Sequence, residues 1–127
     1  MIIDPAANKF SNNGTELLWS KESGLTGFTA QTISLNHSKY KMLYIVLAHS
    51  ITSTTPAKTS MIINDASIGP QIVWCGDATK EAYRSVEITT NGLSISSGVL
   101  RSYNSDGTVS ESTSNSVALP IRIYGGY

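Results

Sequence analysis

Tyr-Lys-Met-Leu-Tyr-Ile-Val-Leu-Ala, residues 40–48, is the longest apolar run in the chain. Ile45 and Val46 are β-branched and Tyr44 is aromatic, and side chains of these kinds pack well on a pleated sheet. The run is far shorter than the about 20 residues that a membrane-spanning helix needs. Periodicity alone does not separate a short buried strand from a buried helix, but the polar segments on either side are poor continuations of a helix. The run therefore predicts a strand in the middle of a sheet, buried on both faces.

Length and composition limit the class of protein. The chain has 127 residues, which is a common size for one domain and is enough to fold without disulfides or a structural metal. Ser and Thr are abundant and good helix formers are not, which favours strands over helices. The net charge is 0 and only 14% of residues are charged, which argues against nucleic-acid binding and against attraction to an anionic membrane. Low net charge also favours self-association.

The chain has one cysteine, Cys75, so no disulfide can form within it. No basic segment followed by an apolar segment stands at the N-terminus, so we expect no signal peptide. If the protein acts outside a cell, we expect it to reach that place by assembly into a particle that is released by lysis.

Short apolar or alternating segments separated by turn residues follow one another along the whole chain. The predicted strands are 15–20, 28–35, 40–48, 60–64, 71–74, 83–90, 93–96, 98–103 and 117–124. We expect residues 1–14 to form a polar arm and 15–127 to form one domain. Residues 51–59 are expected to be a loop or a poor edge strand, 109–115 to be a loop, and 78–82 to have slight helical character. About eight or nine short strands predict an all-β fold, an antiparallel β-sandwich or a jelly-roll variant of it.

The clearest local signal is a hairpin. Residues 83–90 alternate, with Tyr83, Val86 and Ile88 as the apolar set, and a second alternating run follows. Asn91 and Gly92 lie between the two runs, and this dipeptide favours a two-residue type I′ turn because both residues tolerate positive φ angles.

Three segments resemble the C-terminal domain of tail-associated proteins from bacteriophages and prophages of gut Firmicutes. Thr-Glu-Leu-Leu-Trp at 15–19 resembles the family's E-L-L-W, and Phe-Thr-Ala-Gln-Thr-Ile-Ser-Leu at 28–35 with Tyr40 resembles F-A-A-Q-T-I-x-L-x-x-S-x-Y. Leu-Pro-Ile-Arg-Ile-Tyr-Gly at 119–125 resembles the closing I-P-x-x-I-Y-G. The resemblance extends from Thr15 to the C-terminus, with a looser match over 50–77.

The resemblance implies a structural module of a phage tail or fibre, where binding to the host surface is the usual assignment. It implies a virion protein that is made in the bacterial cytoplasm, works as a homo-oligomer, with a trimer favoured, and contacts other tail proteins and a cell-surface polysaccharide. A non-enzymatic glycan-binding module is therefore the leading hypothesis. The alternatives are a purely structural assembly or capping domain, and a small hydrolase of cell-wall glycan.

The two tryptophans are candidates for stacking on a sugar ring. Trp19 lies in an apolar strand, so a place against the core is the stronger interpretation. Trp74 stands at a strand end next to Cys75, Gly76 and Asp77, which makes it the better candidate for a binding face.

Residues 103–107 combine an aromatic ring with amide and carboxylate groups that could hold sugar hydroxyls. The same residue types also form an ordinary turn for backbone reasons. The predicted ligand-binding residues are Trp74, Asp77, Tyr103, Asn104 and Asp106.

Neither a metal site nor a catalytic site is predicted, and no cofactor is expected. His37 and His49 flank the central strand and lie too far apart along it to share a metal. Cys75 has no nucleophile signature around it, and a lone cysteine usually behaves as a small apolar side chain. No two of the nine acidic residues stand out as the carboxylate pair of a glycosidase.

Overall fold

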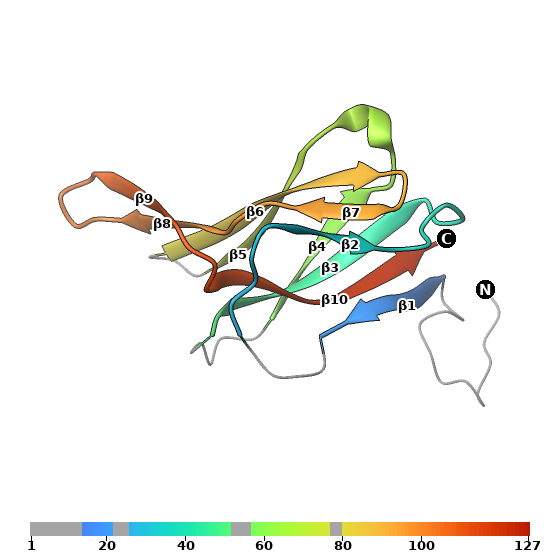
Figure 1. The fold of residues 1–127 in the computed structure, drawn as a ribbon. Coiled ribbons are helices and arrows are strands. Elements are labelled where there is room, and N and C mark those ends of the chain that lie inside the picture. The colour runs from blue at the N-terminus through green and yellow to red at the C-terminus, as the bar shows by residue number, and fades with distance from the viewer. Residues whose placement is uncertain (1–13, 22–25, 52–56, 77–79) are drawn as a thin grey trace.

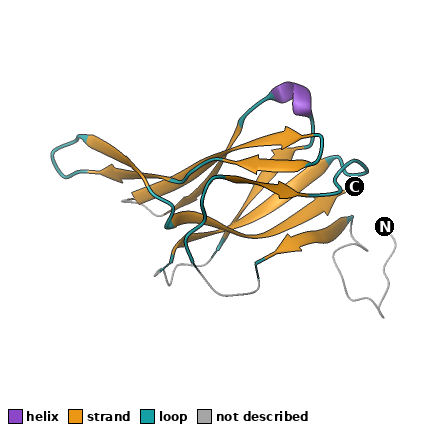
Figure 2. Cartoon of the chain, in the orientation of Figure 1, coloured by secondary structure: helices purple, strands orange, loops and turns teal. Residues whose placement is uncertain are grey.

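The computed structural model describes residues 14–21, 26–51, 57–76 and 80–127. Within them the chain forms two antiparallel sheets, as the sequence predicts, with a single short 3₁₀ turn at Ala66–Ile68 (Figures 1 and 2). The described strands are β1 (Thr15–Ser20), β2 (Gln31–Ser34), β3 (Met42–Ser50), β4 (Lys58–Ile63), β5 (Gln71–Gly76), β6 (Lys80–Thr89), β7 (Gly92–Ile95), β8 (Val99–Tyr103), β9 (Val109–Thr113) and β10 (Val117–Gly126).

The smaller sheet has the strand order β1-β10-β3-β4, so β3 is an interior strand as predicted. Its alternate residues Leu43, Ile45 and Leu47 are fully buried. The expectation that both faces of this strand are buried is wrong, because Tyr44 and Val46 are only partly covered. The strand belongs to an antiparallel sheet with a single core face, and such sheets commonly leave the other face open.

The larger sheet has the order β2-β7-β6-β8-β9, with β5 on the opposite edge of β6. The two halves of β6 therefore have different neighbours on one side, β7 next to one half and β8 next to the other. The inner faces of the two sheets enclose the core. Its fully buried members from the larger sheet include Val73, Val86, Leu93 and Ile95.

An arginine lies inside this core. The side chain of Arg84 on β6 is 0% exposed and donates hydrogen bonds to backbone carbonyls. Its Nε lies 2.8 Å from the Ala118 oxygen, its Nη1 2.9 Å from the Ser96 oxygen and its Nη2 3.0 Å from the Val117 oxygen. The Phe28 ring covers it at 5.2 Å. Burial lowers the pKa of Arg84 to about 10, which leaves the guanidinium charged at neutral pH.

The position of Arg84 corrects the predicted face of this strand. The inward residues of β6 are Ala82, Arg84, Val86 and Ile88, so Tyr83 points outward and does not share a face with Val86 and Ile88. Residues two apart share a face of a strand, and Tyr83 has the opposite parity to the other two.

The hairpin between β6 and β7 is confirmed, but its predicted turn type is wrong. Thr89 pairs with Gly92, so the two loop residues are Thr90 and Asn91, and neither Asn91 nor Gly92 has a positive φ angle. Gly92 is needed for another reason, because a Cβ atom there would lie 1.9 Å from the backbone oxygen of Ile33 on β2.

Other segments also differ from the sequence-based prediction. Residues 109–113 form strand β9 rather than a loop, because β8 offers an edge with which they pair. Residues 80–82 belong to β6 and are not helical. The predicted strand at 28–35 is reduced to β2. Within 51–59, predicted as a loop or a poor edge strand, the edge strand β4 begins at Lys58. The polar arm lies outside the described residues except for Gly14, whose oxygen accepts a hydrogen bond from the Tyr127 amide at 2.7 Å.

Candidate functional site

Aromatic and charged side chains gather on the outer face of the six-stranded sheet. Trp74 on β5 is directly opposite Tyr83 on β6, and both point away from the core. Their ring centroids are 4.7 Å apart at an angle of 45°. The tryptophan is 43% exposed, so a large part of its surface is open to a ligand while the tyrosine supports its other side.

An open cavity of about 450 Å³ adjoins the tryptophan, and it is lined by Lys58, Trp74, Cys75, Gly76 and Glu81. Pockets that hold small molecules usually measure about 300–1,000 Å³. The described lining residues include a lysine, a glutamate and a tryptophan, a mixture that suits a polar ligand with an apolar face.

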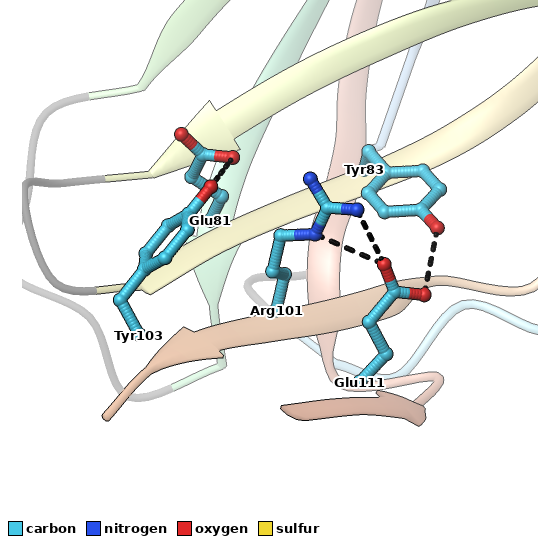
Figure 3. Close-up of polar contacts among 5 residues, drawn as sticks. All are labelled: Glu81, Tyr83, Arg101, Tyr103 and Glu111. Carbon is cyan, nitrogen blue, oxygen red and sulfur yellow. Dashed lines mark hydrogen bonds and ion pairs between the residues drawn. The ribbon is translucent and has the colours of Figure 1, made fainter. Parts of the chain in front are cut away.

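A polar network continues the same face across three strands (Figure 3). Arg101 on β8 holds Glu111 on β9 through Nε at 2.9 Å and Nη2 at 2.7 Å from the same carboxylate oxygen. The other oxygen of Glu111 accepts a hydrogen bond of 3.3 Å from the Tyr83 hydroxyl. Tyr103 donates a hydrogen bond of 3.0 Å to Glu81. Each charged group is thereby held in a defined direction along the sheet surface.

The network shifts the titration of its members. The hydrogen bond to Glu111 is the main reason why the pKa of Arg101 is raised, and Tyr103 adds to it. Burial and then the negative charge of Glu111 raise the pKa of the Tyr83 hydroxyl. At neutral pH the face therefore presents the guanidinium of Arg101 and the protonated phenol of Tyr83.

A second hollow of about 370 Å³ lies further along the larger sheet, over β2, β6 and β7. Its lining is rich in hydroxyl and other polar groups and includes Thr32, Ser85, Glu87, Ser94 and Ser96. The outer face of this sheet therefore offers hydrogen-bonding groups well beyond the tryptophan.

The structure brings two of the five predicted ligand-binding residues onto this face. Trp74 lines the cavity, and Tyr103 is bonded to Glu81, which lines the same cavity. Asp77 lies outside the described residues.

Asn104 and Asp106 lie in the turn between β8 and β9, and their polar atoms serve the turn. Asp106 Oδ1 accepts hydrogen bonds from the amide and the hydroxyl of Thr108, at 2.9 and 2.6 Å. Asn104 Nδ2 donates to the hydroxyls of Thr108 and Ser110 at 2.9 and 3.0 Å. This pattern is typical of Asn and Asp in turns and matches the turn interpretation of these residues.

The remaining candidates serve the fold. Trp19 packs against the core and meets the Phe28 ring edge-on at 6.3 Å. His37 Nε2 lies 2.8 Å from the Thr89 oxygen. The thiol of Cys75 is buried near the Leu47 oxygen, and burial raises the pKa of that thiol, so the protonated form prevails at neutral pH.

The described part of the chain contains neither a cluster of metal-ligating side chains nor a membrane-spanning helix. Its His, Cys, Asp and Glu residues form no group of three or more that could hold a metal ion. None of its helices has the length and apolar content needed to span a bilayer.

Sequence reasoning missed most of the side chains that line the cavity or form the polar network, namely Lys58, Glu81, Tyr83, Arg101 and Glu111. If the residues of 80–89 had been assigned to the correct faces of the strand, Glu81 and Tyr83 would have been predicted to point outward. Lys58, Arg101 and Glu111 come from other strands. Their proximity depends on which strands are neighbours, and no local pattern in the sequence reveals this.

Comparison with known proteins finds no matching family model, no matching curated protein and no matching solved structure. The described chain is an all-β sandwich whose six-stranded sheet has an aromatic and polar outer face.

Proposed function

We propose that this chain is a phage or prophage tail-associated module that binds a glycan of the host cell surface. The binding surface, which we call the Trp74 face, is the outer face of the larger sheet around Trp74, Tyr83 and Glu81 together with the adjoining cavity. The observation that carries the binding role is the exposed Trp74 ring, supported by Tyr83 and bordered by a cavity with a carboxylate and an ammonium group. The phage setting rests on the sequence resemblance at 15–19, 28–40 and 119–125.

The mechanism is stacking combined with hydrogen bonds to hydroxyl groups. The C–H face of a pyranose ring lies on the open side of the indole, since aromatic side chains provide a large rigid apolar surface. Sugar hydroxyls donate to the Glu81 carboxylate and accept from the Lys58 ammonium, the charged groups of two described residues that line the cavity. The tyrosine behind the indole limits its movement and so reduces the entropy lost on binding.

Single-site binding is expected to be weak, because the surface is open to water. A dissociation constant near 1 mM corresponds to only about −4 kcal/mol. Several copies on one particle, as in a trimer or other homo-oligomer attached to the remaining tail proteins, raise the avidity through effective concentration.

The proposal includes no chemical turnover. A glycosidase needs one carboxyl group that stays protonated near neutral pH, which burial or a neighbouring carboxylate provides. Glu111 is 41% exposed and paired with Arg101, and Glu81 accepts a hydrogen bond from Tyr103. These surroundings suit two carboxylates that hold hydroxyl groups in place.

The test is titration of the ¹⁵N-labelled protein with solubilised wall polysaccharides of Gram-positive gut bacteria, followed by NMR. We expect the largest shifts on β5, β6, β8 and the start of β4 at Lys58. We also expect at least about a tenfold loss of affinity for Trp74→Ala, equal to about 1.4 kcal/mol. Ile68→Ala is the matched control, because Ile68 is also exposed (45%) but lies in the 3₁₀ turn.

Equal affinity of Trp74→Ala and the unchanged protein would refute the role of this face. A blank glycan screen together with tight association with other tail proteins would favour the structural capping role. Release of reducing sugar from the polysaccharide would favour the hydrolase.

A further inference from the structure

The outward side chains of β5 and β6 form two parallel columns on the larger sheet. Side chains two positions apart share a face of a strand. On β6 the outward column is polar and includes Glu81, Tyr83, Ser85 and Glu87. On β5 the outward side chains are Ile72 and Trp74, which are 46% and 43% exposed. The pairing register places Trp74 beside Tyr83 and Ile72 beside Ser85, so an apolar column runs alongside a polar one.

The polar column connects the Trp74 cavity to the second hollow of the same face. Glu81 lines the cavity of about 450 Å³, and Ser85 and Glu87 line the hollow of about 370 Å³. The rise along a strand is about 3.4 Å per residue, so about 20 Å separates Glu81 from Glu87. The two hollows therefore lie at the two ends of one row of side chains, over a length that exceeds a single sugar ring.

The second hollow, which we call the Ser94 hollow, has a mostly polar described lining. The register places Glu87, Ser94 and Thr32 in one row across β6, β7 and β2 (Figure 1). Both Glu87 and Thr32 are exposed. Within the described part of the chain, the hydroxyls of Thr32, Ser85 and Ser94 form no hydrogen bond. These hydroxyls are therefore available to a ligand.

We propose that the larger sheet binds a linear, uncharged polysaccharide lengthwise along β6, with one stretch of the chain in the Trp74 cavity and another in the Ser94 hollow. This inference rests on the glycan binding proposed above and assigns the class of glycan, an extended chain rather than a single terminal sugar. A single ring in the Trp74 cavity would leave Ile72 and the Ser94 hollow without a contact.

A sugar chain has the same two-sided character as the two columns. The C–H faces of its rings lie on Trp74 and Ile72, where apolar surface is removed from water. Its hydroxyls reach the β6 column, where the Glu87 carboxylate accepts hydrogen bonds and the serine and threonine hydroxyls both donate and accept them. Each sugar unit along the sheet adds contacts of the same kind, so the affinity grows with the number of units bound.

The charge of the Ser94 hollow favours a chain without anionic groups. Glu87 is the one charged residue among the described residues that line this hollow. A phosphate or carboxylate group of a ligand would be repelled by Glu87 there, and no cation in the described lining would compensate. A neutral sugar chain meets no such cost.

The experiment is titration of the ¹⁵N-labelled full chain with oligosaccharides of graded length, followed by NMR. They are made by partial acid hydrolysis of wall polysaccharides of Gram-positive gut bacteria, and anion exchange separates the neutral chains from the anionic ones. We expect single sugars to shift only the amides around the Trp74 cavity, whereas neutral chains that span both hollows also shift the amides of β2 and β7. The affinity for the longest neutral chains should exceed that for single sugars at least about tenfold.

A double variant separates this result from a statistical effect, since a long chain offers more registers to a single site. Thr32→Ala with Ser94→Ala removes two adjacent hydroxyls of the Ser94 hollow. Because each hydrogen bond contributes modestly, we expect about a tenfold lower affinity for the longest neutral chains and an unchanged affinity for single sugars. The matched control is Thr59→Ala with Ser112→Ala, because these residues are also exposed on strands but are not among the described lining of either hollow.

The outcomes separate this inference from the proposed function. Equal affinity for single sugars and long chains, or an equal effect of the double variant and its control on long chains, would overturn the inference and leave the Trp74 face in place. Tighter binding of the anionic chains would overturn the assignment of an uncharged polysaccharide. No binding at any length would overturn both the inference and the glycan-binding role.

Discussion

Replacing Arg84 by methionine tests whether the buried guanidinium stabilises the junction of the two sheets. Methionine has a similar length and apolar stem but no donor. The substitution leaves the carbonyls of Ser96, Val117 and Ala118 without the hydrogen bonds of 2.9, 3.0 and 2.8 Å that the guanidinium donates.

The magnitude follows from those three carbonyls. Each buried polar group that loses its partner costs about 1–3 kcal/mol. Removal of the charge recovers part of the desolvation cost of burying it, so we expect Arg84→Met to lower the free energy of unfolding by about 3–5 kcal/mol. Domains of this size are stable by only about 5–15 kcal/mol, so the loss is a large fraction of the total.

The assay is equilibrium unfolding in urea, followed by circular dichroism, with the slope of the transition compared between variants. Arg84→Lys should still cost about 2 kcal/mol, because an ammonium cannot reproduce the planar fork of donors. The matched control is Arg101→Met. That side chain is 36% exposed and pairs with Glu111 on the surface, where such pairs contribute about 0–1 kcal/mol. A loss below about 1 kcal/mol for Arg84→Met would refute the assigned role of the guanidinium.

Two further predictions concern the hairpins of the larger sheet. Gly92→Ala should lower the free energy of unfolding by about 2–3 kcal/mol. The added Cβ atom would lie 1.9 Å from the Ile33 oxygen and would push β2 away from β7. Unchanged stability in urea would contradict this prediction, because β2 would then move without cost. The β8–β9 turn should loosen in acid. Hydrogen bonds from the hydroxyl and then the amide of Thr108 lower the pKa of Asp106 from its ordinary value of 3.8, so their stabilisation is present above pH 3.8 and is lost as the pH falls below it. NMR titration of the Thr108 amide should report this loss in the unchanged protein but not in Asp106→Asn, and a pH-independent Thr108 signal would contradict the assignment.

Much of the fold could be predicted from the sequence, because the signals involved are local. The apolar run at 40–48 specifies β3, and the turn signals at Asn91 and at 104–107 mark where strands end. The alternation of apolar and polar residues failed to predict the inward face of β6, where a charged side chain is buried. An arginine at an inward position made the pattern of β6 unreadable, since a charged side chain is rarely buried without a charged partner.

The candidate site could be predicted only in part. Trp74 and Tyr103 stand out as aromatic residues next to turn signals, and the structure places both on one sheet face. The polar residues around them come from β4, β6, β8 and β9. Their proximity depends on strand order, which no property of one segment determines.

The sequence by itself determined the class of fold. Abundant hydroxyl and β-branched residues, short alternating segments and frequent turns are compatible with strands and with little else, because each of these preferences acts within a few residues. The tertiary structure alone decided which strands are neighbours and that Arg84 lies inside the core. These features depend on pairings between distant segments, and a change of one residue in register would move every side chain of a strand to the opposite face.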